Sequence, residues 1–478
     1  MNYKSISYIL GWIMKVEGVF LLLPLAVSLL YREKTWPVFL ACALLSLVLG
    51  TALSFKRPEN FQFYAREGYV GVALGWIVMS LVGALPFYFT GEIPSFTDSL
   101  FEIISGFTTT GASILPRVED LSNGILIWRS FSHWIGGMGV LVFVLQIMPM
   151  TSGQTMHLMR AESPGPSVSK LVPRIRTTAF FLYGIYVMLT VLEIILLLLG
   201  RLPLFDAVCT AFGTAGTGGF GIRSDSIAGY SPYVQVVVTI FMMLFGTNFA
   251  FYYLIIARKL KDAFCMEEVK LYFGIFAAAT LLITINILSQ IGNVGDSLRH
   301  AAFQVASIMT TTGFATADFD KWPEFSRTLL VFLMFVGACA GSTGGGIKVS
   351  RILMYMKTIK KELAILIHPR SVKVVLIDGK KLDHPVVRAA NIFLISYAGI
   401  LALSILLLSI DNFDFTTNVT AVISALNNIG PGLSLVGPSG NFAFFSGFSK
   451  YVLMFDMLAG RLEIFPMLLL FVPYTWKK

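Results

Sequence analysis

The sequence predicts an all-α integral membrane protein in which four pseudo-symmetric helix–pore loop–helix repeats surround a central pore and follow an N-terminal helix pair. Three observations lead to this fold. The 478 residues are 56% hydrophobic and 13% charged, whereas soluble domains carry about 25% charged residues. Apolar runs long enough to cross a bilayer core of about 30 Å recur along the chain. Four short segments between these runs end in related sequences, which indicates internal repetition.

The first two apolar runs, 7–30 and 36–55, form the predicted N-terminal two-helix extension, residues 1–65. The first run lacks a small-residue cleavage site, and the second run follows it directly. We therefore interpret both as retained helices rather than as a signal peptide.

The distribution of Lys and Arg predicts the orientation in the membrane. Most of these residues fall in short polar stretches at 56–66, 160–176, 258–270 and 348–388 and at the C-terminus. The positive-inside rule makes these stretches cytoplasmic. Both termini are then inside, and the number of crossings is even. The alternate loops carry more acidic than basic residues, and an acidic mouth raises the local concentration of cations.

Ten crossings are expected, and the last eight pair into four pore repeats. The repeats are residues 66–160, 161–262, 263–365 and 366–478, and their paired crossings lie at 69–90 and 124–149, 178–200 and 232–257, 269–291 and 327–358, and 386–410 and 444–472. Between the members of each pair lies an apolar segment of about a dozen residues, which is too short to span. We interpret each of these segments as a re-entrant half-helix.

The ends of the four half-helices form the predicted selectivity filter. They read Thr108-Thr109-Thr110-Gly111, Gly216-Thr217-Gly218-Gly219, Thr310-Thr311-Thr312-Gly313 and Asn427-Asn428-Ile429-Gly430. Irregular backbone is tolerated at membrane depth only where protein buries it or water lines it. Four such ends therefore predict one shared cavity. Four ordinary loops are the alternative, but they do not explain why the ends occupy equivalent places in the repeats.

The backbone of these ends is suited to a cation. Carbonyl groups from four converging strands can replace the hydration shell of the ion, and glycine permits the φ > 0 conformation that turns a carbonyl toward the axis. No Lys or Arg stands at the glycine ends, so a basic lining for anions is not expected. The predicted filter residues are Thr109, Thr110, Gly111, Thr217, Gly218, Gly219, Thr311, Thr312, Gly313, Asn428, Ile429 and Gly430.

A glycine-rich stretch interrupts the second crossing of the third repeat. It reads Gly341-Ser342-Thr343-Gly344-Gly345-Gly346 and is followed by Lys348. Each glycine costs about 1 kcal/mol in a helix interior, so this stretch should break the helix. A phosphate-binding loop is disfavoured because Ile347 precedes Lys348 and Val349 follows it. The stretch from Gly341 to Gly346 is therefore interpreted either as a movable gate or as a passive kink.

Arg461 lies near the middle of the last predicted crossing. A lone arginine at that depth costs roughly 2.5–3.5 kcal/mol, so it should face the bundle interior or a cavity. Its expected role is a positive barrier below the filter, and the alternative is pairing with Glu463 or Asp456. His133 and Trp134 precede the small-residue patch Gly136-Gly137-Met138-Gly139, which we interpret as a site of close helix packing.

Five motifs together resemble one known family. They are Thr108 to Gly111, Ser132 to Gly139, Thr217-Gly218-Gly219-Phe220, Gly341 to Lys348, and Gly460-Arg461-Leu462-Glu463. Over essentially its full length the chain resembles the TrkH family of the Trk/Ktr/HKT superfamily of potassium transporters, including the extra N-terminal helix pair. Some relatives with serine at the first filter position favour sodium, whereas this chain has Gly111. The fourth filter strand departs most from the threonine pattern.

The resemblance implies potassium uptake through a selective pore in the bacterial cytoplasmic (inner) membrane. It implies a homodimer with one pore in each protomer, K⁺ held by the filter carbonyls, and a gate formed by the loop from Gly341 to Gly346 with Lys348 and Arg461. It also implies a separate cytoplasmic nucleotide-binding regulator of the TrkA type. No cofactor is expected in this chain, because the nucleotide belongs to the regulator.

Other functions are less consistent with the sequence. A secondary transporter with inverted repeats would alternate its units, whereas the charge pattern places all four half-helices on the outer side. No catalytic constellation or Walker motif is evident, so an enzyme is not expected. The net charge of +9 sits in short loops between apolar runs, so a nucleic-acid partner is not expected either. Pure channel activity and symport with protons or sodium both remain open.

Overall fold

The computed structural model describes residues 1–56, 65–139, 175–371 and 373–477. The N-terminal extension consists of α1 (Tyr3–Phe20), α2 (Leu22–Leu30) and α3 (Trp36–Leu53). Helices α1 and α3 cross at two glycines, because a Cβ on Gly11 would lie 2.7 Å from the Gly50 carbonyl oxygen and a Cβ on Gly50 equally close to that of Gly11. Small residues of this kind let helix backbones approach closely in a membrane.

The remaining helices follow the predicted order of long helix, half-helix and second helix. Repeat 1 contains α4 (Ala65–Gly83), α5 (Leu85–Phe89), the half-helix α6 (Phe96–Phe107) and α7 (Asn123–Met138). Repeat 2 contains α10 (Ile175–Leu199), the half-helix α11 (Leu204–Ala215), α12 (Pro232–Phe245), α13 (Phe249–Ile256) and α14 (Leu260–Cys265). Repeat 3 contains α15 (Glu267–Ile291), the half-helix α16 (Val294–Met309), η1 (Phe319–Lys321), α17 (Glu324–Val336) and α18 (Val349–Ile367). A hairpin of β1 (Leu376–Ile377) and β2 (Lys380–Lys381) leads to repeat 4, with α19 (His384–Leu408), η2 (Ser409–Asp411), the half-helix α20 (Phe415–Asn427), η3 (Ser434–Val436), α21 (Gly447–Arg461), α22 (Phe465–Phe471) and α23 (Pro473–Trp476).

Among the described residues, six segments are long and apolar enough to cross a membrane, or seven if one bent helix pair counts as a span. The six are Tyr3–Leu30, Trp36–Leu53, Arg66–Phe89, Phe180–Leu199, Glu267–Ile291 and His384–Asp411. Large apolar side chains remain exposed along α3, α10, α15 and α19, including Val48, Ile195, Ile285 and Leu406. An exposed apolar surface of this extent is typical of contact with lipid.

The second helices of the repeats are more broken than the sequence predicts. The expected break in repeat 3 is present between Val336 and Val349. The predicted crossing 232–257 is divided into α12 and α13, which meet at an angle of 88°. Asn248 causes this break locally, since its side chain caps α13 by accepting the Ala250 N–H at 2.9 Å.

The predicted crossing 444–472 is likewise divided into two helices. Helix α21 ends at Arg461, and α22 begins at Phe465 after Glu463 and Ile464 adopt φ values of 54° and 71°. In repeat 1 the second crossing is described only as far as residue 139, so the rest of the predicted span 124–149 lies outside the described residues, as does most of the basic stretch 160–176.

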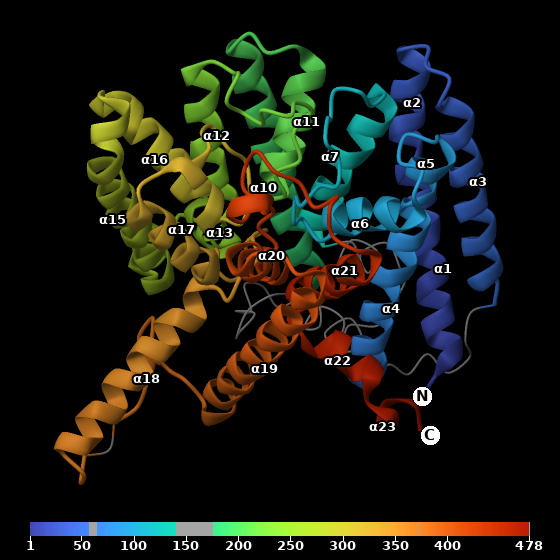
Figure 1. Cartoon of the computed structure of the whole chain (residues 1–478). Helices are drawn as coiled ribbons and strands as arrows, with labels where there is room; N and C mark the ends of the chain where they lie inside the picture. The colour runs from blue at the N-terminus through green and yellow to red at the C-terminus, as the bar shows by residue number, and fades with distance from the viewer. Residues whose placement is uncertain (57–64, 140–174, 372, 478) are drawn as a thin grey trace.

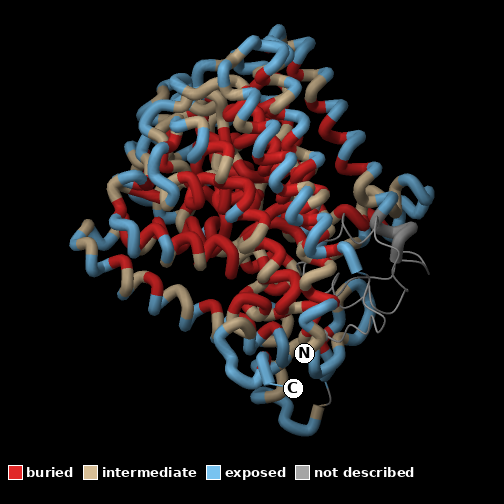
Figure 2. The backbone as a smooth tube through the Cα atoms, turned by 90° about the vertical axis from the view of Figure 1, so that its right-hand side faces the viewer, coloured by how far each residue is buried: buried red, intermediate tan, exposed pale blue. Residues whose placement is uncertain are grey.

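The two termini lie side by side at one end of the molecule (Figure 1). The Tyr3 hydroxyl donates to the Trp476 carbonyl at 3.4 Å, and Arg66 donates to the Lys477 carbonyl at 3.1 Å. Helix α18 projects at the same end, away from the body. Buried residues gather in the middle of the molecule, where the four half-helices end (Figure 2).

Candidate functional site

The four half-helices end in one and the same capping motif. In each, one N–H bonds the carbonyl three residues back and the next N–H bonds the carbonyl five residues back, which is the Schellman motif. The first set of bonds runs from Thr109, Thr217, Thr311 and Asn428 at 2.9–3.2 Å, and the second set from Thr110, Gly218, Thr312 and Ile429 at 2.8–3.0 Å. The predicted filter segments therefore share one backbone geometry as well as a sequence pattern.

The residue at the turn of each motif is left-handed but is not glycine. Its φ is 54° at Thr109, 53° at Thr217, 59° at Thr311 and 56° at Asn428. Threonine is β-branched and rarely adopts this conformation, whereas asparagine tolerates it. The departure of Asn428 from the threonine pattern thus relieves strain rather than altering the turn. Strained backbone of this kind costs of order 1–3 kcal/mol per residue and concentrates at functional sites.

The four strands close into a ring. Gly111, Gly219, Gly313 and Gly430 have φ values between 77° and 102°. A Cβ on any of them would strike a carbonyl oxygen of the next strand in sequence order, and the last strand meets the first. The oxygens are those of Gly218, Thr312, Ile429 and Thr110. Only glycine therefore fits at these four positions.

The carbonyls of this ring are available to a ligand. The residues before the glycines are Thr110, Gly218, Thr312 and Ile429, and all four are buried. Among the hydrogen bonds between described residues, their carbonyl oxygens accept none. Buried carbonyl groups require a partner. A cation or a water molecule is chemically able to be that partner.

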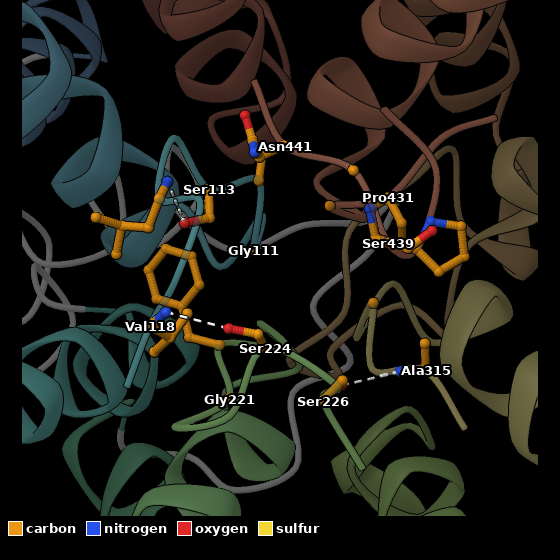
Figure 3. A pocket seen from close by; sticks show the side chains of 18 of the residues that line it. Gly111, Ser113, Val118, Gly221, Ser224, Ser226, Ala315, Pro431, Ser439 and Asn441 are labelled. Carbon is orange, nitrogen blue, oxygen red and sulfur yellow. Dashed lines mark hydrogen bonds between the residues drawn. The ribbon is translucent and has the colours of Figure 1, made fainter. Parts of the chain in front are cut away.

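A pocket lies above the ring and is lined by the loops that follow the four glycines (Figure 3). Hydrogen bonds join successive loops. Val118 N–H donates to Ser224 Oγ at 3.2 Å, Ala315 N–H to Ser226 Oγ at 3.1 Å, Ser434 N–H to Asp320 Oδ1 at 3.2 Å, and Phe442 N–H to the Ser113 carbonyl at 2.8 Å. The loops that line this pocket are thus linked in the same circular order as the four predicted filter strands.

Glu119 strengthens the link between the first two loops. Its carboxylate accepts the Ser224 N–H at 2.6 Å and the Ser224 hydroxyl at 2.5 Å. These bonds, the hydroxyl bond first, lower the pKa of Glu119 to about 2. Glu119 is therefore a carboxylate at neutral pH and adds negative charge to the mouth.

The glycine-rich loop lies against the inner side of the ring. Gly345 N–H donates to Thr311 Oγ1 at 2.6 Å. A Cβ on Gly344 would lie 2.7 Å from the Thr310 carbonyl oxygen, and one on Gly345 would strike that of Asn427. Lys348 is buried and donates from Nζ to the Gly344 carbonyl. The loop is thus in direct contact with the half-helix ends of repeats 3 and 4.

Arg461 lies between the loop and the first filter strand. Its guanidinium donates to the Thr343 carbonyl at 2.9 Å, to Thr109 Oγ1 at 3.3 Å and to the Gly136 carbonyl at 2.5 Å. Glu463, considered as a partner, instead forms an ion pair with Arg351 at 2.7 Å. Gly460 lets α21 approach α20, because a Cβ there would strike the Leu426 carbonyl oxygen.

The other side of the glycine-rich loop is hydrogen-bonded to the break between α12 and α13 and to Glu268. This contact was not predicted from the sequence. Cys339 N–H donates to the Gly246 carbonyl at 3.0 Å, and Phe249 N–H donates to that of Gly341 at 3.1 Å. Glu268 accepts the Ala340 N–H at 2.6 Å and the Asn248 amide at 3.2 Å. The glycine-rich loop of repeat 3, which is the candidate gate, is thus bonded to the break between α12 and α13 in repeat 2. Glu268 could have indicated this contact from the sequence, because a carboxylate at the start of an apolar run is costly to bury without a partner.

Comparison with known proteins identifies close relatives over the whole chain. A family model described as TrkH, cation transport protein, matches residues 36–478. Proteins named "Trk system potassium uptake protein TrkH" from Salmonella typhimurium and Escherichia coli K12 are 36% identical over 488 residues, covering 100% of this chain and of each relative. The crystal structure of the potassium transporter TrkH from Vibrio parahaemolyticus matches with a TM-score of 0.89 and 33% identity, again over 100% of both chains.

Proposed function

Because the chain belongs to the TrkH family of cation transport proteins, we propose that it mediates potassium uptake through a selective pore whose filter is the ring at Gly111, Gly219, Gly313 and Gly430. The observation that carries this proposal is the closure of the ring, in which every glycine abuts a free carbonyl of the next strand. The names of the relatives, which are potassium uptake proteins, support K⁺ as the transported ion.

The proposed filter uses backbone oxygens rather than charged side chains. A ring of carbonyl dipoles replaces the water around a cation without binding it so tightly that it cannot leave. The half-helix C-termini at the ring add the negative ends of their dipoles. The Schellman bonds hold each strand in a fixed conformation, and glycine is required for close approach between strands.

In this proposal the loop from Gly341 to Gly346 closes the pore below the filter. The loop contacts Thr311 and Arg461, so it lies where an ion leaving the filter would pass. The Arg461 charge opposes a cation at the same level. Four of its six residues are glycines and have no side chain that would lock the loop, so its alternative positions can differ by only a few kcal/mol.

We further propose that the chain acts as a homodimer in the bacterial cytoplasmic membrane, with a TrkA-type nucleotide-binding regulator at the end that carries both termini. Helix α18 extends at this end and carries Lys357, Lys360 and Lys361. Helix α18 is joined directly to the glycine-rich loop through Lys348. A partner that moves α18 would therefore move the loop.

Reversal potentials of the purified protein in planar bilayers test the proposed function, with potassium, sodium and pH gradients varied separately. The reversal potential should follow the potassium gradient. Gly111→Ser and Gly313→Ser should both lower the K⁺/Na⁺ permeability ratio, because each side chain pushes the neighbouring carbonyl out of the ring. Gly399→Ser on α19 is the matched control, since nothing lies within 4 Å of its Cβ position. Unchanged ratios in both folded filter variants would remove these glycines from the filter.

A further inference from the structure

The second filter strand lacks a support that the first and third strands have. In repeats 1 and 3 the side chains of two threonines meet, Thr108 with Thr110 at 2.8 Å and Thr310 with Thr312 at 2.7 Å. Repeat 2 has Gly216 and Gly218 at the equivalent positions. Its strand therefore needs another means of holding its carbonyls in place.

His133 of α7 fills the space of the missing threonines. A Cβ on Gly218 would strike the His133 imidazole, and a Cβ on Gly216 would strike the His133 carbonyl oxygen. The two glycines of repeat 2 are thus matched to the histidine of repeat 1. Gly216 and Gly218 thus leave room for the backbone and the imidazole of His133.

The His133 ring holds backbone groups on both sides. Its Nε2 accepts the Phe220 N–H at 3.1 Å, directly after filter residue Gly219, and its Nδ1 lies 2.8 Å from the Gly106 carbonyl oxygen. A backbone N–H can only donate, so Nε2 is unprotonated and Nδ1 carries the proton that bonds Gly106. The fully buried ring is therefore held in one neutral tautomer between the two repeats.

Arg129, one turn earlier on the same face of α7, holds the next backbone group of the strand. Its guanidinium donates to the Gly221 carbonyl at 3.1 Å and stacks 4.0 Å from the centre of the Phe220 ring. The His133 ring also contacts Phe220, and the two ring centres lie 4.2 Å apart. Phe220 is thus held by its N–H, its ring and the following carbonyl.

Glu102 of half-helix α6 balances the Arg129 charge. The two side chains are 0% and 2% exposed and lie 2.7 Å apart. Glu102 also accepts the Ile114 N–H at 3.0 Å and the Ser113 hydroxyl at 2.9 Å, directly beyond the first filter strand. A buried ion pair contributes little to net stability compared with apolar packing, so stability alone does not explain its placement on the backbone of two filter strands.

We propose that Glu102, Arg129 and His133 are positioning residues that determine ion specificity, because they set the carbonyls of Gly218 and Gly219 at the distance suited to K⁺. The proposal rests on the proposed filter. It assigns the control of strand 2 to side chains that do not face the ion. Loss of one member should let the strand relax and admit Na⁺ more readily.

Two substitutions at His133 separate positioning from packing. His133→Asn keeps a donor at the δ position for Gly106 but removes the acceptor for Phe220. His133→Gln provides an acceptor at the ε position. The Asn variant should lower the K⁺/Na⁺ permeability ratio by about threefold to tenfold, the effect of one backbone hydrogen bond. The Gln variant should stay nearer to the wild type. A merely structural histidine would give the same ratio in both.

Arg129→Lys gives a second and independent test. Lysine keeps the positive charge beside Glu102 but loses the planar stack on Phe220 and the fork that reaches Gly221. We expect a lower K⁺/Na⁺ ratio and a smaller difference between melting temperatures in KCl and in NaCl. Lys450→Gln is the control, because Lys450 forms a partly buried ion pair at 2.6 Å with Asp98 in the first turn of half-helix α6, which also carries Glu102. It should leave the ratio unchanged.

The outcomes distinguish this inference from the proposed function. Wild-type ratios in His133→Asn and Arg129→Lys, together with a lowered ratio in Gly111→Ser, would overturn the positioning role and leave the filter in place. Wild-type ratios in these two variants and also in both Gly111→Ser and Gly313→Ser would overturn the filter itself. If Arg129→Lys does not fold, the comparison of the Asn and Gln variants at His133 decides.

Discussion

The Arg461 guanidinium donates to the Thr343 carbonyl oxygen at 2.9 Å, which joins the helix before the last break to the middle of the glycine-rich loop. The same guanidinium reaches Thr109 of the first filter strand at 3.3 Å. One side chain is therefore hydrogen-bonded both to the proposed filter and to the loop, so a change in either alters its hydrogen bonds.

We predict that Arg461→Ala increases ion flux, because it removes a positive charge and a hydrogen bond that holds the loop closed. Flux of ⁸⁶Rb⁺ into proteoliposomes measures this directly, and an increase of several-fold is expected without any regulator. Arg461→Lys should show a smaller increase, since it keeps the charge but loses the fork that bonds two acceptors at once. Wild-type flux with reduced expression in the Ala variant would make the residue purely structural.

A short deletion within the loop should also produce leak. Removing Gly344 and Gly345 withdraws the backbone that packs against the Thr310 and Asn427 carbonyls, while the filter strands stay intact. Basal flux should rise at an unchanged K⁺/Na⁺ permeability ratio. A folded deletion variant with the same low basal flux would show that the loop is a passive kink.

Glu268 should act as an anchor of the closed loop. Glu268→Ala removes the acceptor for Ala340 and Asn248, so the loop is released from the break in repeat 2 and basal flux should increase. Glu268→Gln keeps an acceptor oxygen, and its flux should stay close to that of the wild type. Equal flux in the two variants would contradict the anchor. Both variants are measured alongside Gly399→Ala, which changes an open helix surface.

The bond between Glu119 and Ser224 predicts a pH-dependent contribution to stability. The pKa of Glu119 is lowered from 4.5 to about 2 in the folded state. The contribution of Glu119 to the free energy of unfolding is therefore fully present above the pKa that Glu119 has in the unfolded chain. It is lost as the pH falls toward the pKa of the folded state. The melting temperature of Glu119→Gln should lie below that of the wild type at pH 7, and the gap should narrow between pH 5 and pH 3. A gap that stays constant over this range would exclude the carboxylate as its cause.

The sequence by itself predicted those structural elements that depend only on residues close together in the chain. Apolar runs of sufficient length identify crossings, and the four Thr/Gly and Asn/Gly ends identify half-helix termini, because chain length and glycine conformation do not depend on distant partners. In the structure short helices lie at these four places and end at Phe107, Ala215, Met309 and Asn427. The sequence also located the break in repeat 3, since several glycines in a helix are unfavourable wherever the helix lies.

Only the tertiary structure decided which groups meet. The order of the ring and the contact between Arg461 and Thr343 depend on packing between segments that are far apart in the chain, 118 residues in the case of Arg461 and Thr343. The breaks at Asn248 and Ile464 escaped detection because their segments are apolar enough to continue as helix. Glu102 and Arg129 were each visible as charges in apolar surroundings, but nothing in either segment indicates its partner. A buried charge without a partner carries a large desolvation penalty. The partner comes from a segment distant in the chain, so only the tertiary structure identifies it.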